Sequence, residues 1–179
     1  VIDARQAGDT RLAVKSAANI SRALVDSGRD QEALDSLNRT AEQAQSLPAS
    51  HEKAYVMISI GRLYSRLAGS VKTTQAELEK LSANNLKAAA SIAESIDDNR
   101  AVSYAYGYLG ELQEQAGNTD EAMDSTRKAL YYLRATPAAE ISYRWQWQEG
   151  RLLEAQGDTE LASGASNRAV GDLQTVRPV

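Results

Sequence analysis

Residues 150–169 read GRLLEAQGDTELASGASNRA, and residues 110–129, forty positions earlier, read GELQEQAGNTDEAMDSTRKA. Small residues recur at the same four offsets in both stretches: they are Gly110, Gly117, Ala122 and Ala129 in the earlier one and Gly150, Gly157, Ala162 and Ala169 in the later one. Four matches at fixed offsets are improbable by chance, and repetition at such a period is typical of repeat architectures. The sequence therefore predicts a chain built from repeated units.

Two earlier stretches continue the pattern. Gly61 opens one unit, whose second half is displaced by an insertion at about residues 69–81, and Ser21 replaces the opening glycine of the first unit. With the insertion allowed for, the openings lie about 40 residues apart, as expected for stacked helical hairpins. We expect one repeat domain over residues 1–179, which we take for a fragment of a longer protein. The expected units cover about 9–46, 50–97, 99–135 and 138–175.

Each unit is predicted to be a helical hairpin. In the unit that begins at residue 99, Val102, Ala105, Leu109 and Leu112 recur with the 3.6-residue period of an amphipathic helix. The helix ends at Gly117, a residue that favours the positive φ of a helix C-terminus. Thr74, with a glutamate three residues later, predicts a capping box at a helix start, and residues 1–7 are interpreted as the tail of an earlier helix. The chain is therefore all-α, with helices predicted at 9–27, 30–46, 50–67, 74–97, 99–116, 119–135, 138–156 and 159–175.

Composition limits the function classes. The chain has 179 residues, no cysteine, one histidine and a formal net charge of −4. Nucleic-acid binders usually carry a basic excess, so this class is disfavoured. The single histidine, His51, cannot complete a metal site, and cysteine chemistry is excluded, so we expect no cofactor and no enzyme. No run of 18 apolar residues occurs, so we expect no membrane span. We expect a soluble protein, and the cytoplasm is favoured over the periplasm although the lack of cysteine fits both.

The pattern of Leu109–Gly110, Gly117, Ala122 and Ala129 resembles the tetratricopeptide repeat (TPR), with units longer than usual. The resemblance implies a right-handed α-α superhelix of about four hairpins. It also implies a concave groove that is lined by the first helix of each hairpin. The residues that match the groove positions are Lys15, Asn19, Arg22, Tyr55, Arg62, Arg66, Tyr104, Tyr108, Glu111, Arg144, Trp147 and Arg151.

A narrower resemblance lies at residues 143–158, where Tyr143-Arg144-Trp145-Gln146-Trp147 precedes Gly150-Arg151-Leu152-Leu153 and Ala155-Gln156-Gly157-Asp158. This run is similar to the last repeat of the helical region that precedes the caspase-like protease domain of bacterial CHAT-domain proteins. The resemblance implies that the chain is a regulatory arm whose catalytic domain would follow Val179.

The proposed groove is cationic and aromatic, and such side chains dominate interface hot spots. Three alternatives stay open. The arginines can form intrahelical pairs, such as Arg22 with Asp26, and the tyrosines can pack between repeats. Trp145 and Trp147, about 200° apart on a helix, cannot both enter one core, so we assign Trp145 to packing and Trp147 to the groove or to a following domain. The third alternative is that neighbouring helices shield both tryptophans.

The sequence thus predicts a scaffold that binds a protein or peptide partner in its groove, through an acidic or aromatic segment. The alternatives are a regulatory arm that contacts a downstream domain of the same chain and, with least support, an enzyme in its own right. The carboxylate clamp of chaperone-binding repeats is not matched: the corresponding positions hold Ala18, Arg22, Ser59, Tyr104 and Tyr108.

Overall fold

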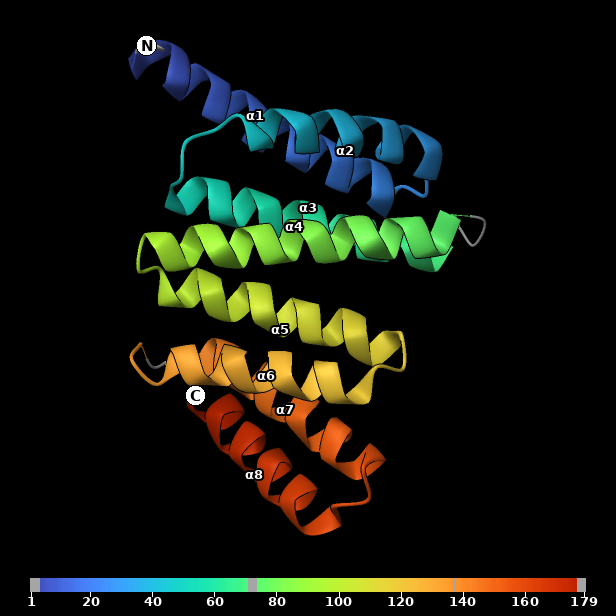
Figure 1. The fold of residues 1–179 in the computed structure, drawn as a ribbon, viewed down its shortest axis with the longest axis vertical. Helices are drawn as coiled ribbons and strands as arrows, with labels where there is room; N and C mark the ends of the chain where they lie inside the picture. Colours follow the sequence, from blue (N-terminus) through green and yellow to red (C-terminus); the bar gives the residue numbers. More distant parts are fainter. Residues whose placement is uncertain (1–3, 71–73, 137, 177–179) are drawn as a thin grey trace. The chain divides into compact units, whose positions relative to one another are not determined.

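The computed structural model describes residues 4–70, 74–136 and 138–176, and within these ranges the chain forms eight helices and no strand. The helices are α1 (Ala4–Asp26), α2 (Asp30–Gln45), α3 (His51–Ser70), α4 (Gln75–Ser95), α5 (Asn99–Gln115), α6 (Thr119–Leu133), α7 (Ala139–Ala155) and α8 (Thr159–Val176) (Figure 1). The prediction of an all-α chain is confirmed.

The chain divides into two compact units, Val1–Asp98 and Asn99–Val179. The first holds the hairpins α1–α2 and α3–α4, and the second holds α5–α6 and α7–α8 (Figure 1). Within the first unit α3 packs on both α1 and α2, and within the second α7 packs on both α5 and α6. Each unit is therefore a pair of stacked helical hairpins.

Three of the four hairpins turn in the same way. The turns place Gly28, Gly117 and Gly157 at φ values of +69°, +78° and +85°. In each, the N–H of the next residue donates to a carbonyl five positions earlier; for example, Asp158 donates to Leu153 over 2.9 Å. This arrangement satisfies carbonyl groups that the helix end leaves without a partner. The glycines that define the sequence repeat thus have a backbone reason.

The other repeated glycines lie where the helices of a hairpin cross. A Cβ atom on Gly110 would lie 3.1 Å from the Ala122 carbonyl oxygen, and one on Gly150 would lie 3.3 Å from the Ala162 carbonyl oxygen. Their counterpart Ser21 is fully buried, and its hydroxyl oxygen lies 2.9 Å from that of Ser36. These small residues therefore allow the two helices of a hairpin to approach closely.

The insertion lengthens two helices. Gly61 crosses the second helix of its hairpin at Ser82: a Cβ atom on Gly61 would lie 3.2 Å from the Ser82 carbonyl oxygen. Gly61 and Ser82 are 21 residues apart, whereas Gly110 and Ala122 are 12 apart. Helix α3 runs to Ser70, beyond the predicted end at residue 67, and α4 starts at Gln75. Outside residues 71–73, which are not described, the extra residues are helical.

Two local predictions need correction. Thr74 does precede α4, but its side chain makes no capping hydrogen bond, and its Oγ1 is buried without a partner among the described residues. Residues 4–7 do not belong to a separate helix, because α1 runs without a break from Ala4 to Asp26. Gly8 lies inside it, and a glycine there costs about 1 kcal/mol relative to alanine, too little to end a helix of this length.

Candidate protein-interaction face

Gly107 lies where α5 meets α7 in the second unit. A Cβ atom there would lie 2.2 Å from Cε2 of Trp145, so only glycine leaves room for the indole ring. Trp145 is 1% exposed, and its Nε1–H donates to the Ser103 hydroxyl over 3.2 Å. The prediction that Trp145 belongs to the packing between helices is confirmed.

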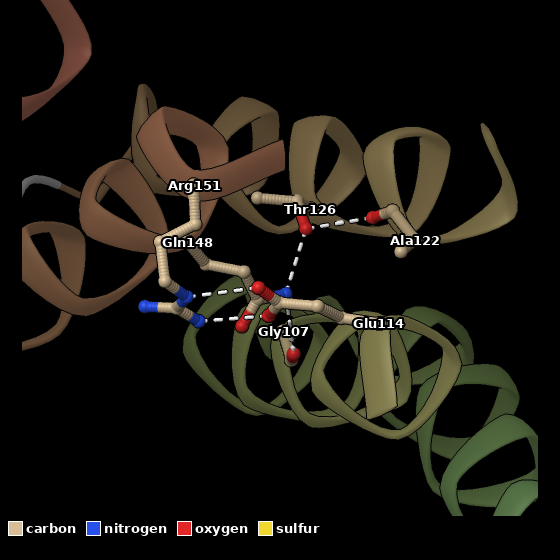
Figure 2. Close-up of polar contacts among 6 residues, drawn as sticks. All are labelled: Gly107, Glu114, Ala122, Thr126, Gln148 and Arg151. Atoms are coloured by element: carbon tan, nitrogen blue, oxygen red, sulfur yellow. Dashed lines mark hydrogen bonds and ion pairs between the residues drawn. The ribbon is translucent and has the colours of Figure 1, made fainter. Parts of the chain in front are cut away.

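Beside the indole ring lies a buried polar network (Figure 2). The side-chain amide of Gln148, 2% exposed, donates to the Gly107 carbonyl over 3.2 Å and to the Thr126 hydroxyl over 2.7 Å. Thr126 in turn donates to the Ala122 carbonyl over 2.7 Å. The amide therefore links α7 to both α5 and α6, and buried polar groups that are satisfied in this way fix one arrangement of the helices.

One predicted groove arginine is neutralised by a carboxylate of the neighbouring hairpin. Arg151 donates from Nε and Nη2 to the two oxygens of Glu114, over 2.8 and 2.7 Å (Figure 2). These hydrogen bonds raise the pKa of the Arg151 guanidinium above its ordinary value. Since the fork is occupied, Arg151 has little charge left to attract an acidic partner.

Arg144 has different surroundings. Its Nη1 donates to the Tyr108 hydroxyl over 3.0 Å, and its guanidinium carbon lies 5.2 Å from the centroid of the Tyr108 ring and 5.4 Å from that of Trp145. Within the described residues, Arg144 is held by aromatic faces and a hydroxyl rather than by a carboxylate. Its positive charge is therefore not cancelled.

Tyr104 and Tyr108 of α5 contribute more to packing than to the exposed surface. Tyr108 is 6% exposed, and the half-buried Tyr104 stacks on it with ring centroids 6.0 Å apart. Both rings lie nearly perpendicular to the Trp145 ring, with centroids 6.5 Å and 5.2 Å from it. This supports the alternative that the tyrosine stripe packs between repeats.

Trp147 is the exposed aromatic residue of this face, with 47% of its surface accessible. It lines a pocket of about 350 Å³ together with Glu111, Tyr143, Arg144, Trp145, Gln148 and Arg151. We call the part of this surface formed by Glu111, Tyr143, Arg144, Trp147 and Arg151 the tryptophan face. The sequence did not predict a role for the two residues packed behind this face, Gln148 and Gly107.

In the first unit, α1 and α3 carry the other predicted groove residues: Lys15, Asn19 and Arg22 on α1, and Tyr55, Arg62 and Arg66 on α3. Arg22 donates from Nη2 to the Ser59 hydroxyl over 3.4 Å, and Arg66 forms an ion pair with Asp26 at 2.7 Å. Asp26 therefore pairs with Arg66 of α3. The alternative expected it to pair with Arg22 within α1. Lys15 lines a separate pocket of about 320 Å³ beside α3.

His51 starts α3, as expected, and is exposed. Its Nδ1 lies 2.6 Å from Oδ2 of Asp98, and its ring centroid lies 4.5 Å from that of Tyr55. The Asp98 side chain is only 14% exposed. The reason is that the turn after α4 folds Asp98 back against the start of α3.

The described part of the chain holds no group of three histidine, cysteine, aspartate or glutamate side chains that could bind a metal ion. Among the described helices, none combines the length and the apolar character that a bilayer span requires.

Comparison with known proteins places the fold. The chain is similar to a putative kinesin light chain from Podosopora anserina, whose crystal structure has nearly identical TPR-like repeats. The match covers 94% of this chain and 78% of that chain, with 17% identity and a TM-score of 0.69. A point variant of that protein matches 93% of this chain and 78% of its own, with 18% identity and a TM-score of 0.71. BtubC (BKLC) from P. vanneervenii is less similar, with 16% identity, coverage of 98% and 93%, and a TM-score of 0.49. No protein-family model and no curated protein matches the chain.

The fold is that of TPR-like helical repeats, the architecture that the spacing of glycines and alanines predicts. Proteins of this class are stacks of helical hairpins that offer extended surfaces for binding other proteins.

Proposed function

We propose that the chain is a protein-interaction module and not an enzyme, and that the tryptophan face binds a peptide or protein segment. The observation that carries the proposal is the exposed Trp147 beside Arg144 in a pocket of about 350 Å³. Tryptophan and arginine are the residues most enriched at interface hot spots, and a pocket of this size accepts one or two side chains.

The charges of the face favour a segment with one carboxylate. Arg151 is occupied by Glu114, but Arg144 rests on aromatic rings with its charge uncancelled. A partner's aspartate or glutamate would bind at Arg144, and an apolar neighbour would pack on the indole of Trp147. Glu111, which also lines the pocket, would repel a second acid. The proposed ligand is therefore a segment with a single acid next to an apolar or aromatic residue.

The arginines of the first unit extend the proposal. Arg22, Arg62 and Arg66 are exposed and lie on the first helices of their hairpins, together with Lys15, Asn19 and Tyr55. We propose that these residues form a separate basic contact on the first unit, in which Arg66 takes the smaller part because Asp26 neutralises it. Attraction by exposed arginines would weaken as salt is added.

A displayed random-peptide library, selected against the chain of residues 1–179, tests the proposal. Peptides that carry an acid beside an aromatic or aliphatic residue should be enriched. Trp147→Ala and Arg144→Ala should each reduce the affinity of a selected peptide by about tenfold or more, as expected for hot-spot residues. Arg39→Ala, on the exposed surface of α2, is the matched control. Selected peptides whose affinity is unaffected by both substitutions would exclude the tryptophan face as their site.

The likeness of residues 143–158 to the region that precedes the CHAT protease domain supports an alternative proposal: the chain is a regulatory arm that contacts a protease domain of the same polypeptide. In that case the exposed Trp147 would be covered by the chain's own catalytic domain. The coding sequence downstream of Val179 tests this alternative, since it should then encode a histidine and a cysteine within an α/β domain.

A further inference from the structure

The surface of the last hairpin repeats the surface that receives α7. Shifting by the forty-residue period converts Gly107, Gly110, Glu114 and Thr126, which contact α7, into Trp147, Gly150, Glu154 and Ser166. These four residues line one pocket of about 330 Å³, with Arg151, Thr159, Ala162 and Ser163 as its other members. We call Trp147, Gly150, Glu154 and Ser166 the tail face.

The outer side of α1 repeats the side of α7 that is inserted. The repeat alignment of Ser21 with Gly150 converts Ile141, Trp145, Gln148 and Arg151 into Leu12, Ser16, Asn19 and Arg22. The first three of the α7 residues are buried in the second unit, at 0%, 1% and 2% exposure. Their counterparts on α1 are exposed, and Leu12 is 66% exposed. We call Leu12, Ser16, Asn19 and Arg22 the head face.

We propose that the head face of one copy of this chain binds the tail face of a second copy, with α1 lying on α7–α8 as α7 lies on α5–α6. The proposal goes beyond the binding of a partner at the tryptophan face, and it makes four positions match at once.

The first match is one of size, with large and small exchanged. Within the chain the indole of Trp145 enters the space left by Gly107. On the tail face that space is filled by Trp147, and the residue of the head face that would meet it is the small Ser16. A tryptophan on both sides would clash, and a small residue on both sides would leave a cavity.

The second match is one of charge. Arg151 forms two hydrogen bonds to Glu114 in the second unit. The repeat-related residues are Arg22 on the head face and Glu154 on the tail face, and both are exposed. A pair at this position would again join two helices with a bidentate arginine.

The remaining matches are an amide and the space for it. Gln148 donates to Thr126 above Gly110, where a Cβ atom would lie 2.5 Å from its Nε2. The head face carries Asn19, also an amide, and the tail face keeps both the hydroxyl, on Ser166, and the glycine, Gly150. The polar network in Figure 2 therefore has a counterpart between copies.

The contact joins different faces, so each bound copy leaves one head and one tail unoccupied. Such a heterologous contact yields open chains unless its rotation closes a ring. Sedimentation equilibrium of residues 1–179, from micromolar to near-millimolar concentration, should therefore show an average mass that keeps rising past that of a dimer. A chain that stays monomeric over this range overturns the proposal and points to another occupant of the two faces.

Charge reversal provides the sharpest test. Arg22→Glu places like charges at the contact, and so does Glu154→Arg, so each variant alone should lose association by about tenfold or more. In an equimolar mixture every contact between unlike copies again joins opposite charges, so association should return. Lys87→Glu, exposed on α4, is the matched control and should associate like the unaltered chain. A mixture that associates no better than its components overturns the proposal.

Exchange of sizes provides an independent test. Ser16→Trp should abolish association, because two indole rings would compete for one space. The double variant S16W/W147G recreates the internal arrangement of Trp145 and Gly107, and its association should recover. Circular dichroism of each variant shows whether the helices are retained. If S16W/W147G stays as dissociated as S16W while both are folded, the proposed contact is wrong. Peptide binding at Arg144 can be measured independently of self-association, because neither Arg22→Glu nor Glu154→Arg changes a residue of the tryptophan face.

Discussion

The indole ring of Trp145 occupies the space that a side chain on Gly107 would need, with only 2.2 Å between Cε2 and the Cβ position. The two residues lie on α7 and α5, in different hairpins of the second unit. Their contact sets how closely the hairpins approach, and it is accompanied by the buried amide of Gln148 and the ion pair of Arg151 with Glu114.

Gly107→Ala should destabilise the second unit by about 1–3 kcal/mol, because the new methyl group overlaps a buried, rigid ring. Urea denaturation followed by tryptophan fluorescence measures the effect, since both tryptophans of the chain lie in this unit. Gly171→Ala is the matched control: the Cβ position of this α8 glycine meets nothing within 4 Å. Alanine there should stabilise the helix by about 0.5–1 kcal/mol. Equal effects of the two substitutions would contradict the packing described above.

Gln148→Leu should destabilise the second unit by about 1–3 kcal/mol, because the Gly107 carbonyl and the Thr126 hydroxyl lose their buried donor. The replacement is apolar and of similar size, so the loss reports hydrogen bonding more than volume. Gln115→Leu, exposed at the end of α5, should change the free energy of unfolding by no more than about 0.5 kcal/mol. The same fluorescence-detected denaturation compares the two.

Stability of the first unit should fall in alkali because of Tyr64. Its side chain is 1% exposed, its hydroxyl donates to Oδ1 of Asn38 over 2.7 Å, and burial, with a smaller effect of Glu42, raises its pKa from 10.0 to about 12. Folding thus favours the protonated phenol. The contribution is complete below pH 10.0, the ordinary value, and is lost as the pH rises to about 12, with an upper limit of about 2–3 kcal/mol.

Helix content as a function of urea concentration, measured across this pH window, checks the prediction for Tyr64. Tyr64→Phe should remove part of the alkaline loss, although it also removes the hydrogen bond to Asn38. Tyr131→Phe, at a tyrosine that is 62% exposed, should leave the alkaline profile as it is. A wild-type profile that matches that of Tyr64→Phe would exclude a role for Tyr64.

Trp147→Ala should leave the free energy of unfolding within about 0.5–1 kcal/mol of the original, because about half of the side chain is exposed. It should also remove most of the fluorescence that acrylamide quenches, leaving the protected emission of Trp145. A bound partner at the tryptophan face should protect Trp147 in the unaltered chain. If the emission that remains in Trp147→Ala is readily quenched, the assignment of the buried and exposed tryptophans is reversed.

The hairpins and their turns could be predicted from the sequence, because each depends on residues whose size matters at a fixed offset. Gly117 is needed for a positive φ, and Gly110 for the approach of Ala122, and both signals survive in a single sequence. The end of α3 could not be predicted, because Gly69 and Ser70 are poor helix formers that the lengthened hairpin keeps helical.

Most contacts between hairpins could not be predicted from the sequence. Gln148 reads as a surface residue, and nothing near it in the sequence indicates that Gly107, 41 positions earlier, will lie beside its amide. The cationic groove was predicted from one helix at a time, whereas the carboxylates that neutralise Arg66 and Arg151 come from other helices. Sequence periodicity finds the face of a helix but not the charges that the next helix brings to it.

The place of Trp147 restricts how this chain can grow by gene duplication. A tandem copy of the segment that encodes α7–α8 would bring a second Trp145 against Trp147, where the existing joint has Gly107. Such an insertion would be rejected until one of the two aromatic codons mutated. A copy of the segment for α1–α2, with Ser16 at that position, would not bring two indole rings into one space, so a single bulky side chain decides which hairpin could be added there.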